Sequence, residues 1–82
     1  AGDEEPPDVI VLDPPRSGAG PDVAAAVAAR RPASVVLVSC DPGAFARDAR
    51  TLADHGYRLL AAQPLDLFPM TRHVEIVARF AP

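Results

Sequence analysis

Residues 35–42 read VVLVSCDP and decide the fold of the chain. The first four letters are an unbroken apolar run, which is typical of a strand buried on both faces of a parallel sheet. Asp41 favours the N-cap of a helix and Pro42 suits the first helical position, so a helix is predicted directly after the strand. Cys40 lies between the two elements, at the carboxyl end of the strand.

The same pattern occurs upstream. Residues 9–15 read VIVLDPP, a second apolar run that ends at Asp13 before two prolines. An alanine-rich stretch, residues 22–31, separates the two strands and has high helix propensity. It follows Pro21 and ends with two arginines before Pro32, which is a helix stop, so a short helix is predicted there.

Downstream, a helix that begins at Pro42 ends at Gly56, which suits the C′ position. The apolar residues that this helix places on one face are Phe45, Ala49, Leu52 and Ala53. Residues 57–68 predict a third strand interrupted near Pro64, and alternating apolar residues from 74 to 80 predict a fourth. The short connection between them indicates an antiparallel hairpin.

The order β-α-β-α-β-β indicates an α/β fold with a mainly parallel sheet and a final antiparallel strand. Right-handed crossovers that step in one direction place both helices on one face, which leaves the other face bare. A chain of 82 residues buries only about 60–65% of its unfolded surface. We therefore expect the isolated chain to be poorly stable or to self-associate. A monodisperse monomer that melts cooperatively would contradict this expectation.

Composition excludes several classes of protein. No stretch approaches the 18 uncharged residues of a membrane span, and no leader is apparent, so a cytoplasmic protein is expected. The single cysteine forms no internal disulfide, and no Cys/His spacing suits zinc, so no metal is expected. The net charge of −3 gives no footprint of nucleic-acid binding over the whole chain.

Polar side chains follow the ends of the predicted strands. Asp13 ends the first strand and Cys40 the second, and the hairpin turn brings His73 and Glu75 to the same edge. Taken singly, each has an ordinary structural role. A lone cysteine is usually a small buried hydrophobe, and a glutamate on a strand is usually solvated. Their convergence through topology predicts a site at this edge.

Six motifs stand out along the chain: DPPR at 13–16 with Gly18, SCDP at 39–42, FARD at 45–48, GY at 56–57, PLDLFP at 64–69 and HVE at 73–75. In order and spacing they resemble the motifs of the RNA 5-methyluridine methyltransferases. The resemblance covers nearly the whole chain, from residue 8 to residue 80. DPP alone is shared by many methyltransferases, but the combination is highly specific.

The resemblance implies the carboxyl-terminal half of a Rossmann-like, S-adenosylmethionine-dependent methyltransferase domain, with the last strand inserted between the second and third strands of this chain. Asp13 would contact S-adenosylmethionine, Cys40 would be the nucleophile and Glu75 the proton acceptor, with Arg16 near the substrate nucleotide. No glycine-rich cofactor-binding turn precedes the first strand. Residues 1–82 are thus expected to be a partial catalytic domain, inactive without the missing amino-terminal half.

In the implied reaction the Cys40 thiolate adds to C6 of uracil, which makes C5 nucleophilic enough to accept a methyl group. Glu75 then removes the C5 proton so that the thiolate can leave. The partner would be RNA, with tRNA and ribosomal RNA not distinguished, and the base must leave its stack. Asp41 replaces the asparagine usual in relatives. Its carboxylate opposes thiolate formation and the helix N-terminus favours it, so the net effect stays open.

Three other functions are alternatives to a 5-methyluridine enzyme. An amino-methyltransferase of adenine or guanine also uses a DPP motif, but generally needs an aromatic residue after the prolines, where this chain has Arg16. A 5-methylcytosine enzyme would more often carry a cysteine in or beside that first motif. From a different class comes a catalytically silent α/β module that only binds RNA or a partner. Retention of Asp13, Cys40 and Glu75 in one chain speaks against a silent module.

Overall fold

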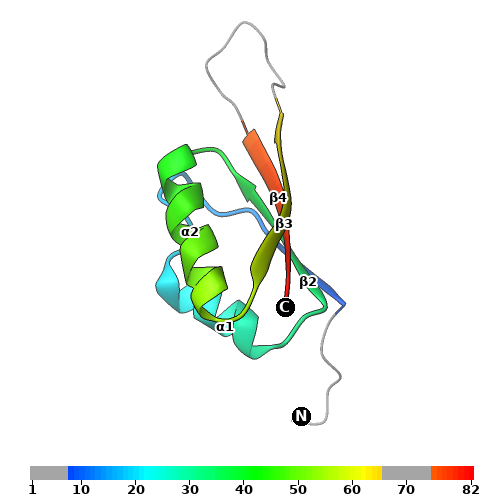
Figure 1. The fold of residues 1–82 in the computed structure, drawn as a ribbon. Coiled ribbons are helices and arrows are strands. Elements are labelled where there is room, and N and C mark those ends of the chain that lie inside the picture. Colours follow the sequence, from blue (N-terminus) through cyan, green and yellow to red (C-terminus); the bar gives the residue numbers. More distant parts are fainter. Residues whose placement is uncertain (1–7, 66–74) are drawn as a thin grey trace, which may run out of the picture.

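The computed structural model describes residues 8–65 and 75–82 of the chain (Figure 1). Its elements are β1 (Val9–Leu12), α1 (Pro21–Ala29), β2 (Ser34–Ser39), α2 (Pro42–Asp54), β3 (Arg58–Leu65) and β4 (Glu75–Ala81). The predicted β-α-β-α-β-β order is confirmed. Residues 66–68, expected to extend the third strand, and Val74, expected to begin the fourth, lie outside the described residues.

The sheet has the strand order β1-β2-β4-β3. β1 pairs with β2 in parallel, whereas β4 pairs antiparallel with both β2 and β3. Three strands therefore run in one direction, and β4, inserted between β2 and β3, runs the opposite way. The antiparallel final strand and its insertion are confirmed. Because β4 separates β2 from β3, β1 and β2 form the one parallel ladder among the described residues.

The third strand differs from the prediction in one respect. Pro64 does not interrupt β3, because it pairs with Ile76 of β4 and the strand continues to Leu65. The irregularity lies instead between Leu59 and Ala61. β3 is an edge strand of the described sheet, and an edge position tolerates a proline, which lacks the N–H donor that a central strand needs.

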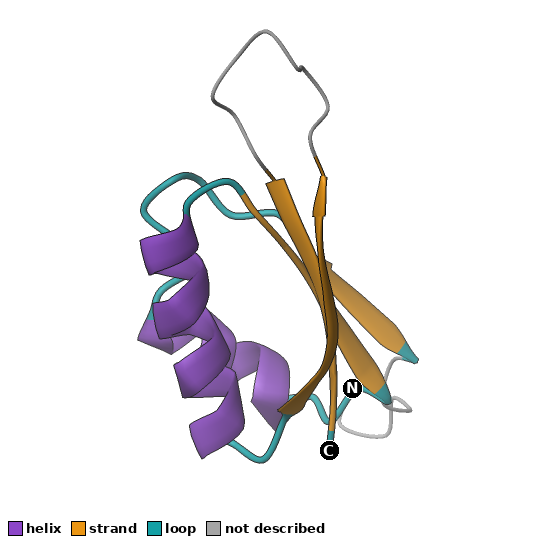
Figure 2. Cartoon of the chain, turned by 45° about the horizontal axis from the view of Figure 1, so that its top comes forward, coloured by secondary structure: helices purple, strands orange, loops and turns teal. Residues whose placement is uncertain are grey.

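Both helices cover the same face of the sheet, as predicted (Figure 2). Between the helices and the sheet lies the core, which comprises Ala24, Val27, Val35, Leu37, Leu52, Tyr57, Ala78 and Phe80. The Tyr57 hydroxyl donates a hydrogen bond of 2.6 Å to the carbonyl oxygen of Pro32. This bond ties the end of α2 to the segment that follows α1.

The buried stripe of α2 is rotated relative to the prediction. Of the four apolar residues expected to face the core, Leu52 is buried, two pack at the border of the core, and Ala53 is exposed. The other buried residues of the helix are Ala44 and Asp48, which lie two turns and one turn before Leu52. A buried carboxylate in this stripe was not predicted.

The helix ends follow local rules. Asp41 is the N-cap of α2, and Gly56 follows its C-cap with φ of 91°, both as predicted. α1 ends at Ala29, two residues earlier than predicted, and Arg31 takes the left-handed conformation with φ of 55°. The ring of Pro32 clashes with a helical residue before it, which explains why Arg31 leaves the helix.

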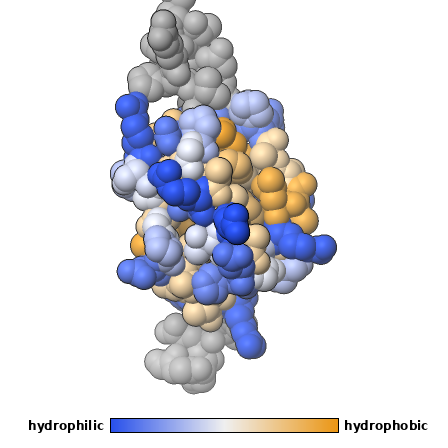
Figure 3. All heavy atoms as spheres, turned by 60° about the vertical axis from the view of Figure 1, so that its left-hand side comes forward, coloured by the Kyte–Doolittle hydropathy of each residue, from blue (hydrophilic) through white to orange (hydrophobic). Residues whose placement is uncertain are grey.

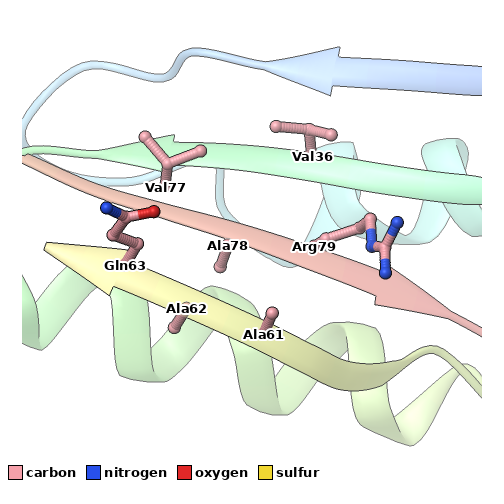
Figure 4. A pocket seen from close by; sticks show the side chains of 7 residues that line it. All are labelled: Val36, Ala61, Ala62, Gln63, Val77, Ala78 and Arg79. Atoms are coloured by element: carbon pink, nitrogen blue, oxygen red, sulfur yellow. The ribbon is translucent and has the colours of Figure 1, made fainter.

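The face of the sheet opposite the helices is bare within the described residues (Figure 2). Val9 and Val11 of β1 are 51% and 62% exposed. A hollow of about 520 Å³ on this face is bordered by β2, β3 and β4. Figure 4 shows Val77 and Arg79 pointing to this side and Ala78 pointing to the other. The bare face is the predicted one; self-association of the isolated chain stays a prediction.

The helical side has a different surface. Figure 3 views this side and shows hydrophilic side chains spread over it. The exposed charged residues of the two helices include Asp22 of α1 and Arg47, Arg50 and Asp54 of α2. Within residues 8–65 and 75–82, no helix is long and apolar enough to cross a membrane.

Candidate active site

The three residues singled out from the sequence lie at the same end of the sheet, which we call the rim: β1 and β2 end there and β4 begins there. Asp13 follows β1 and Cys40 follows β2, while Glu75 begins β4, which starts where β1 and β2 end because it runs antiparallel to them. Arg16 is exposed in the loop after Asp13. His73, the fourth polar residue expected at this edge, lies outside the described residues.

Cys40 and Glu75 are neighbours in the register of the sheet. The last residues that pair between β2 and β4 are Ser39 and Ile76, so Cys40 and Glu75 each lie one residue beyond that pair. Glu75 is held in the sheet from its other side, where it pairs with Leu65 of β3. Both Cys40 and Glu75 are partly buried. A thiol and a carboxylate are thereby brought to the same rim.

The turn that carries Cys40 is fastened on both sides. Ser39, only 2% exposed, donates from its hydroxyl to the carbonyl oxygen of Asp41 at 3.1 Å. The Asp41 carboxylate accepts a hydrogen bond of 2.8 Å from the backbone N–H of Ala44 and so caps α2. Cys40 is a free thiol between these two anchored residues. Its backbone position is therefore set by β2 on one side and by α2 on the other.

Asp13 borders a second hollow. After the two prolines the chain turns back, and the N–H of Gly18 donates to the carbonyl oxygen of Pro15 at 2.8 Å. A hollow of about 320 Å³ lies here, lined by the end of β1, the prolines, Gly18, Ala19 and Val23. Its lining is apolar apart from Asp13, whose carboxylate is an acceptor for hydroxyl or amino groups. Such a hollow suits a ligand with an apolar ring and polar substituents.

Asp48 is the functional candidate that sequence reasoning missed. It is 3% exposed, and its two carboxylate oxygens accept hydrogen bonds from the backbone N–H groups of Ala19 at 2.8 Å and Gly20 at 3.2 Å. Gly20 is the N-cap of α1 and has no side-chain cap of its own. Two signals were present in the sequence: Asp48 ends the FARD motif, and it lies four residues from both Ala44 and Leu52, on a face that is otherwise apolar.

Gly18 makes a close approach to the same part of α2. It has a φ of 92°, and a Cβ added there would lie 3.0 Å from Oδ2 of Asp48 and 3.2 Å from Cβ of Ala44. Both separations are shorter than ordinary van der Waals contact. The loop between β1 and α1 therefore rests directly on α2 at a position that only glycine fits without a shift.

Gly18→Ala should destabilise the complete protein more than Gly56→Ala does. Both glycines have a φ near 90°, but a Cβ at Gly56 meets nothing within 4 Å. We expect Gly56→Ala to cost about 1–2 kcal/mol from backbone strain. Gly18→Ala should cost about 2–4 kcal/mol, because overpacking adds to the same strain. The free energy of unfolding of each variant is measured by urea denaturation, followed by circular dichroism. Equal losses of stability in the two variants would show that crowding against Asp48 does not contribute.

Among the described residues, the end of the sheet that carries Asp13, Cys40 and Glu75 contains neither a cluster of metal ligands nor the larger hollow. In the described part of the chain, no group of three or more His, Cys, Asp or Glu side chains is placed to hold a metal ion. The larger hollow, on the bare face, is lined by Val36, Ala61, Ala62, Gln63, Val77, Ala78 and Arg79 and includes none of Asp13, Cys40 or Glu75 (Figure 4). The chemistry-bearing residues gather at the rim.

Residues 6–79 match the family model described as tRNA (Uracil-5-)-methyltransferase. The chain is similar to uncharacterized RNA methyltransferases of three bacteria. It is 50% identical to that of Thermotoga maritima over 68 residues, which is 83% of this chain and 16% of the relative. For Oceanobacillus iheyensis the identity is 51% over 72 residues, 88% of this chain and 16% of the relative. For Bifidobacterium longum the identity is 50% over 74 residues, which is 90% of this chain and 17% of the relative.

A solved structure is similar as well. The tRNA (uracil-54, C5)-methyltransferase of Pyrococcus abyssi, in complex with S-adenosyl-L-homocysteine, superposes with a TM-score of 0.78 at 40% identity. The match covers 90% of this chain and 18% of that protein. The chain thus spans about a sixth of the length of the relatives it matches.

Proposed function

The chain belongs to the tRNA (uracil-5-)-methyltransferase family, and we propose that the protein carrying it methylates C5 of a uridine in RNA through a covalent adduct with Cys40. The observation that carries the proposal is the antiparallel register of β2 and β4: Ser39 pairs with Ile76, Cys40 directly follows Ser39, and Glu75 directly precedes Ile76. A nucleophile and a base that act on adjacent atoms of one ring need this kind of proximity.

Cys40 acts first in the proposed mechanism. Its thiolate Sγ forms a bond to C6 of the uracil ring, and the electron pair of the C5–C6 double bond moves onto C5 and the adjoining carbonyl. C5 thereby becomes a carbon nucleophile, which unmodified uracil lacks. Cys40 is partly buried rather than enclosed, so a base turned out of its stack can reach it.

Glu75 completes the reaction. Once C5 carries the methyl group, the Glu75 carboxylate accepts the C5 proton. The electrons of that C–H bond restore the C5–C6 double bond, the bond from C6 to Sγ breaks, and the thiolate of Cys40 is regenerated. Glu75 is the first residue of β4 and pairs with Leu65, so its backbone is held while its side chain works.

S-adenosylmethionine, when bound, supplies the methyl group as an electrophile on a sulfonium centre. The similar protein of Pyrococcus abyssi was solved with S-adenosyl-L-homocysteine, the demethylated form of that donor. The apolar hollow beside Asp13 and its single carboxylate fit a ligand of this chemistry. We propose that Asp13 accepts a hydrogen bond from it and so helps to orient it towards the rim.

RNA is the proposed partner, and most of its phosphate contacts are expected outside these residues. The chain has a net charge of −3 and spans about a sixth of its relatives. An acidic piece of this size attracts a polyanion poorly. We propose tRNA as the first substrate to test, because the family description and the name of the Pyrococcus abyssi enzyme both specify it.

The experiment that tests the function identifies the modified nucleoside. The complete protein is incubated with S-adenosylmethionine carrying a labelled methyl group and with unmodified tRNA or ribosomal RNA, and the RNA is digested to nucleosides. We expect the label in 5-methyluridine. Label in methylated adenosine or guanosine would establish the amino-methyltransferase alternative, and no label in either RNA would support a silent module.

A further inference from the structure

Asp48 is an acidic residue in an apolar stripe. It lies between Ala44 and Leu52 on α2 and is 3% exposed. A carboxylate loses its hydration when it is buried, so it is found inside proteins only when hydrogen bonds replace the lost water. Both oxygens have such a replacement here, because Ala19 and Gly20 each donate a backbone N–H to one of them.

Those two donors lie in the loop between β1 and α1, which begins at Asp13, the residue proposed to contact the cofactor. The loop leaves β1 at Asp13 and enters α1 at Gly20, which has no side chain to cap the helix. The first N–H groups of a helix have no partner within the helix. Asp48 supplies an acceptor from a different helix, and Gly18 packs against the same turn of α2.

A continuous set of contacts links this loop to the nucleophile. Cys40 is followed by Asp41, which caps α2 through the N–H of Ala44. One helical turn later Asp48 accepts from Ala19 and Gly20. Helix α2 therefore holds the nucleophile at its amino end and the Asp13 loop along its side.

We propose that Asp48 is a positioning residue, which sets the distance between the cofactor side of the site at Asp13 and the nucleophile Cys40. The inference rests on the proposed function and adds to it a residue that acts through the loop. Asp48 touches no reacting atom. Its effect is on the geometry in which the methyl group and C5 meet, where a displacement of about 1 Å costs roughly 100-fold in rate.

The test compares Asp48→Asn, Asp48→Ala and the control Asp54→Asn in the complete protein. Asn keeps one acceptor oxygen and Ala keeps none, whereas Asp54 is exposed at the far end of the same helix. We expect kcat to fall about 10-fold for Asp48→Asn and about 100-fold for Asp48→Ala. Asp54→Asn should leave kcat unchanged.

Two further readouts separate positioning from loss of the fold. Amide hydrogen exchange at Ala19 and Gly20 should be fastest in the Ala variant, intermediate in the Asn variant and slowest in the unmodified protein. Alkylation of Cys40, followed by peptide mass spectrometry, should keep its rate in all variants, because α2 and its cap remain. Faster alkylation of Cys40 in step with the loss of kcat would reveal general unfolding and overturn the positioning role.

The inference and the proposed function fail in different ways. If the unmodified protein forms no 5-methyluridine, the proposed function is wrong, and the exchange of the Ala19 and Gly20 amides still decides whether Asp48 holds the loop. If that exchange is unchanged in Asp48→Ala, the inference is wrong whatever the activity. Unchanged kcat with lost amide protection overturns it as well, because the loop would then be free without consequence.

Discussion

Cys40→Ala is expected to abolish the covalent complex with RNA that carries 5-fluorouridine at the target position, and to reduce methyl transfer by roughly 10³-fold or more. Fluorine at C5 cannot leave as a cation, so the unmodified protein should methylate the base and then remain bound through the C6–Sγ bond. The complex survives denaturing electrophoresis only if that bond is covalent. Alanine removes Sγ and leaves nothing that can add to C6.

The control for this variant is that it still folds and still binds RNA, although it no longer reacts with it. Cys40 makes no side-chain hydrogen bond among the described residues, and the turn around it is held by Ser39 and Asp41. Cys40→Ala should therefore keep its thermal midpoint and its affinity for unmodified RNA in a filter-binding assay. Cys40→Ser, with a poorer nucleophile of the same shape, should also form no adduct. An adduct that survives in Cys40→Ala would place the nucleophile elsewhere.

The fold was predictable because its signals are local. The apolar runs at residues 9–12 and 35–38, the cap at Asp41 and the positive-φ glycine at residue 56 each act within a few residues of themselves. The predicted end of α1 lies two residues too far along the chain, because Pro32 also disfavours helical geometry at Arg31, the residue before it. The continuity of β3 through Pro64 depends on an edge position, which only the assembled sheet reveals.

The candidate site was likewise predictable from the sequence only in part. Asp13, Cys40 and Glu75 were predicted to share an edge, because the order of the strands decides where each of them ends. The pairing of Ser39 with Ile76 follows from the insertion of β4, which the residues alone did not show and the resemblance implied. Asp48 was missed because its partners, Ala19 and Gly20, are backbone groups far away in the sequence. Backbone donors have no sequence signature.

Glu75→Gln should separate the two halves of the reaction. The amide has nearly the size of the carboxylate but no longer accepts a proton, and the strand pairing of Glu75 with Leu65 does not depend on the side chain. The methyl group should therefore still be transferred in a single turnover, at a rate within about tenfold of the unmodified protein. Release of product should slow by about 10²–10⁴-fold, because a positioned base contributes that much.

The consequence is a covalent complex with ordinary RNA. In Glu75→Gln the methylated ring keeps its C5 proton and its bond to Sγ, so a protein–RNA band should accumulate on denaturing gels without any fluorinated base. The band should contain the labelled methyl group, and it should vanish in the double variant with Cys40→Ala. Asp54→Asn, which also changes an acid to its amide but at an exposed position, should show no band.

The result for Glu75→Gln distinguishes three cases: Glu75 acts after methyl transfer, it acts before the covalent bond forms, or it is not the base. Accumulation of a methylated adduct places Glu75 after methyl transfer, as proposed from its register with Cys40. Normal turnover would remove it from the role of base and leave another acceptor to be found. Loss of the adduct itself would mean that Glu75 acts before the C6–Sγ bond forms, and the two residues would then owe their proximity to binding of the uracil ring rather than to removal of its proton.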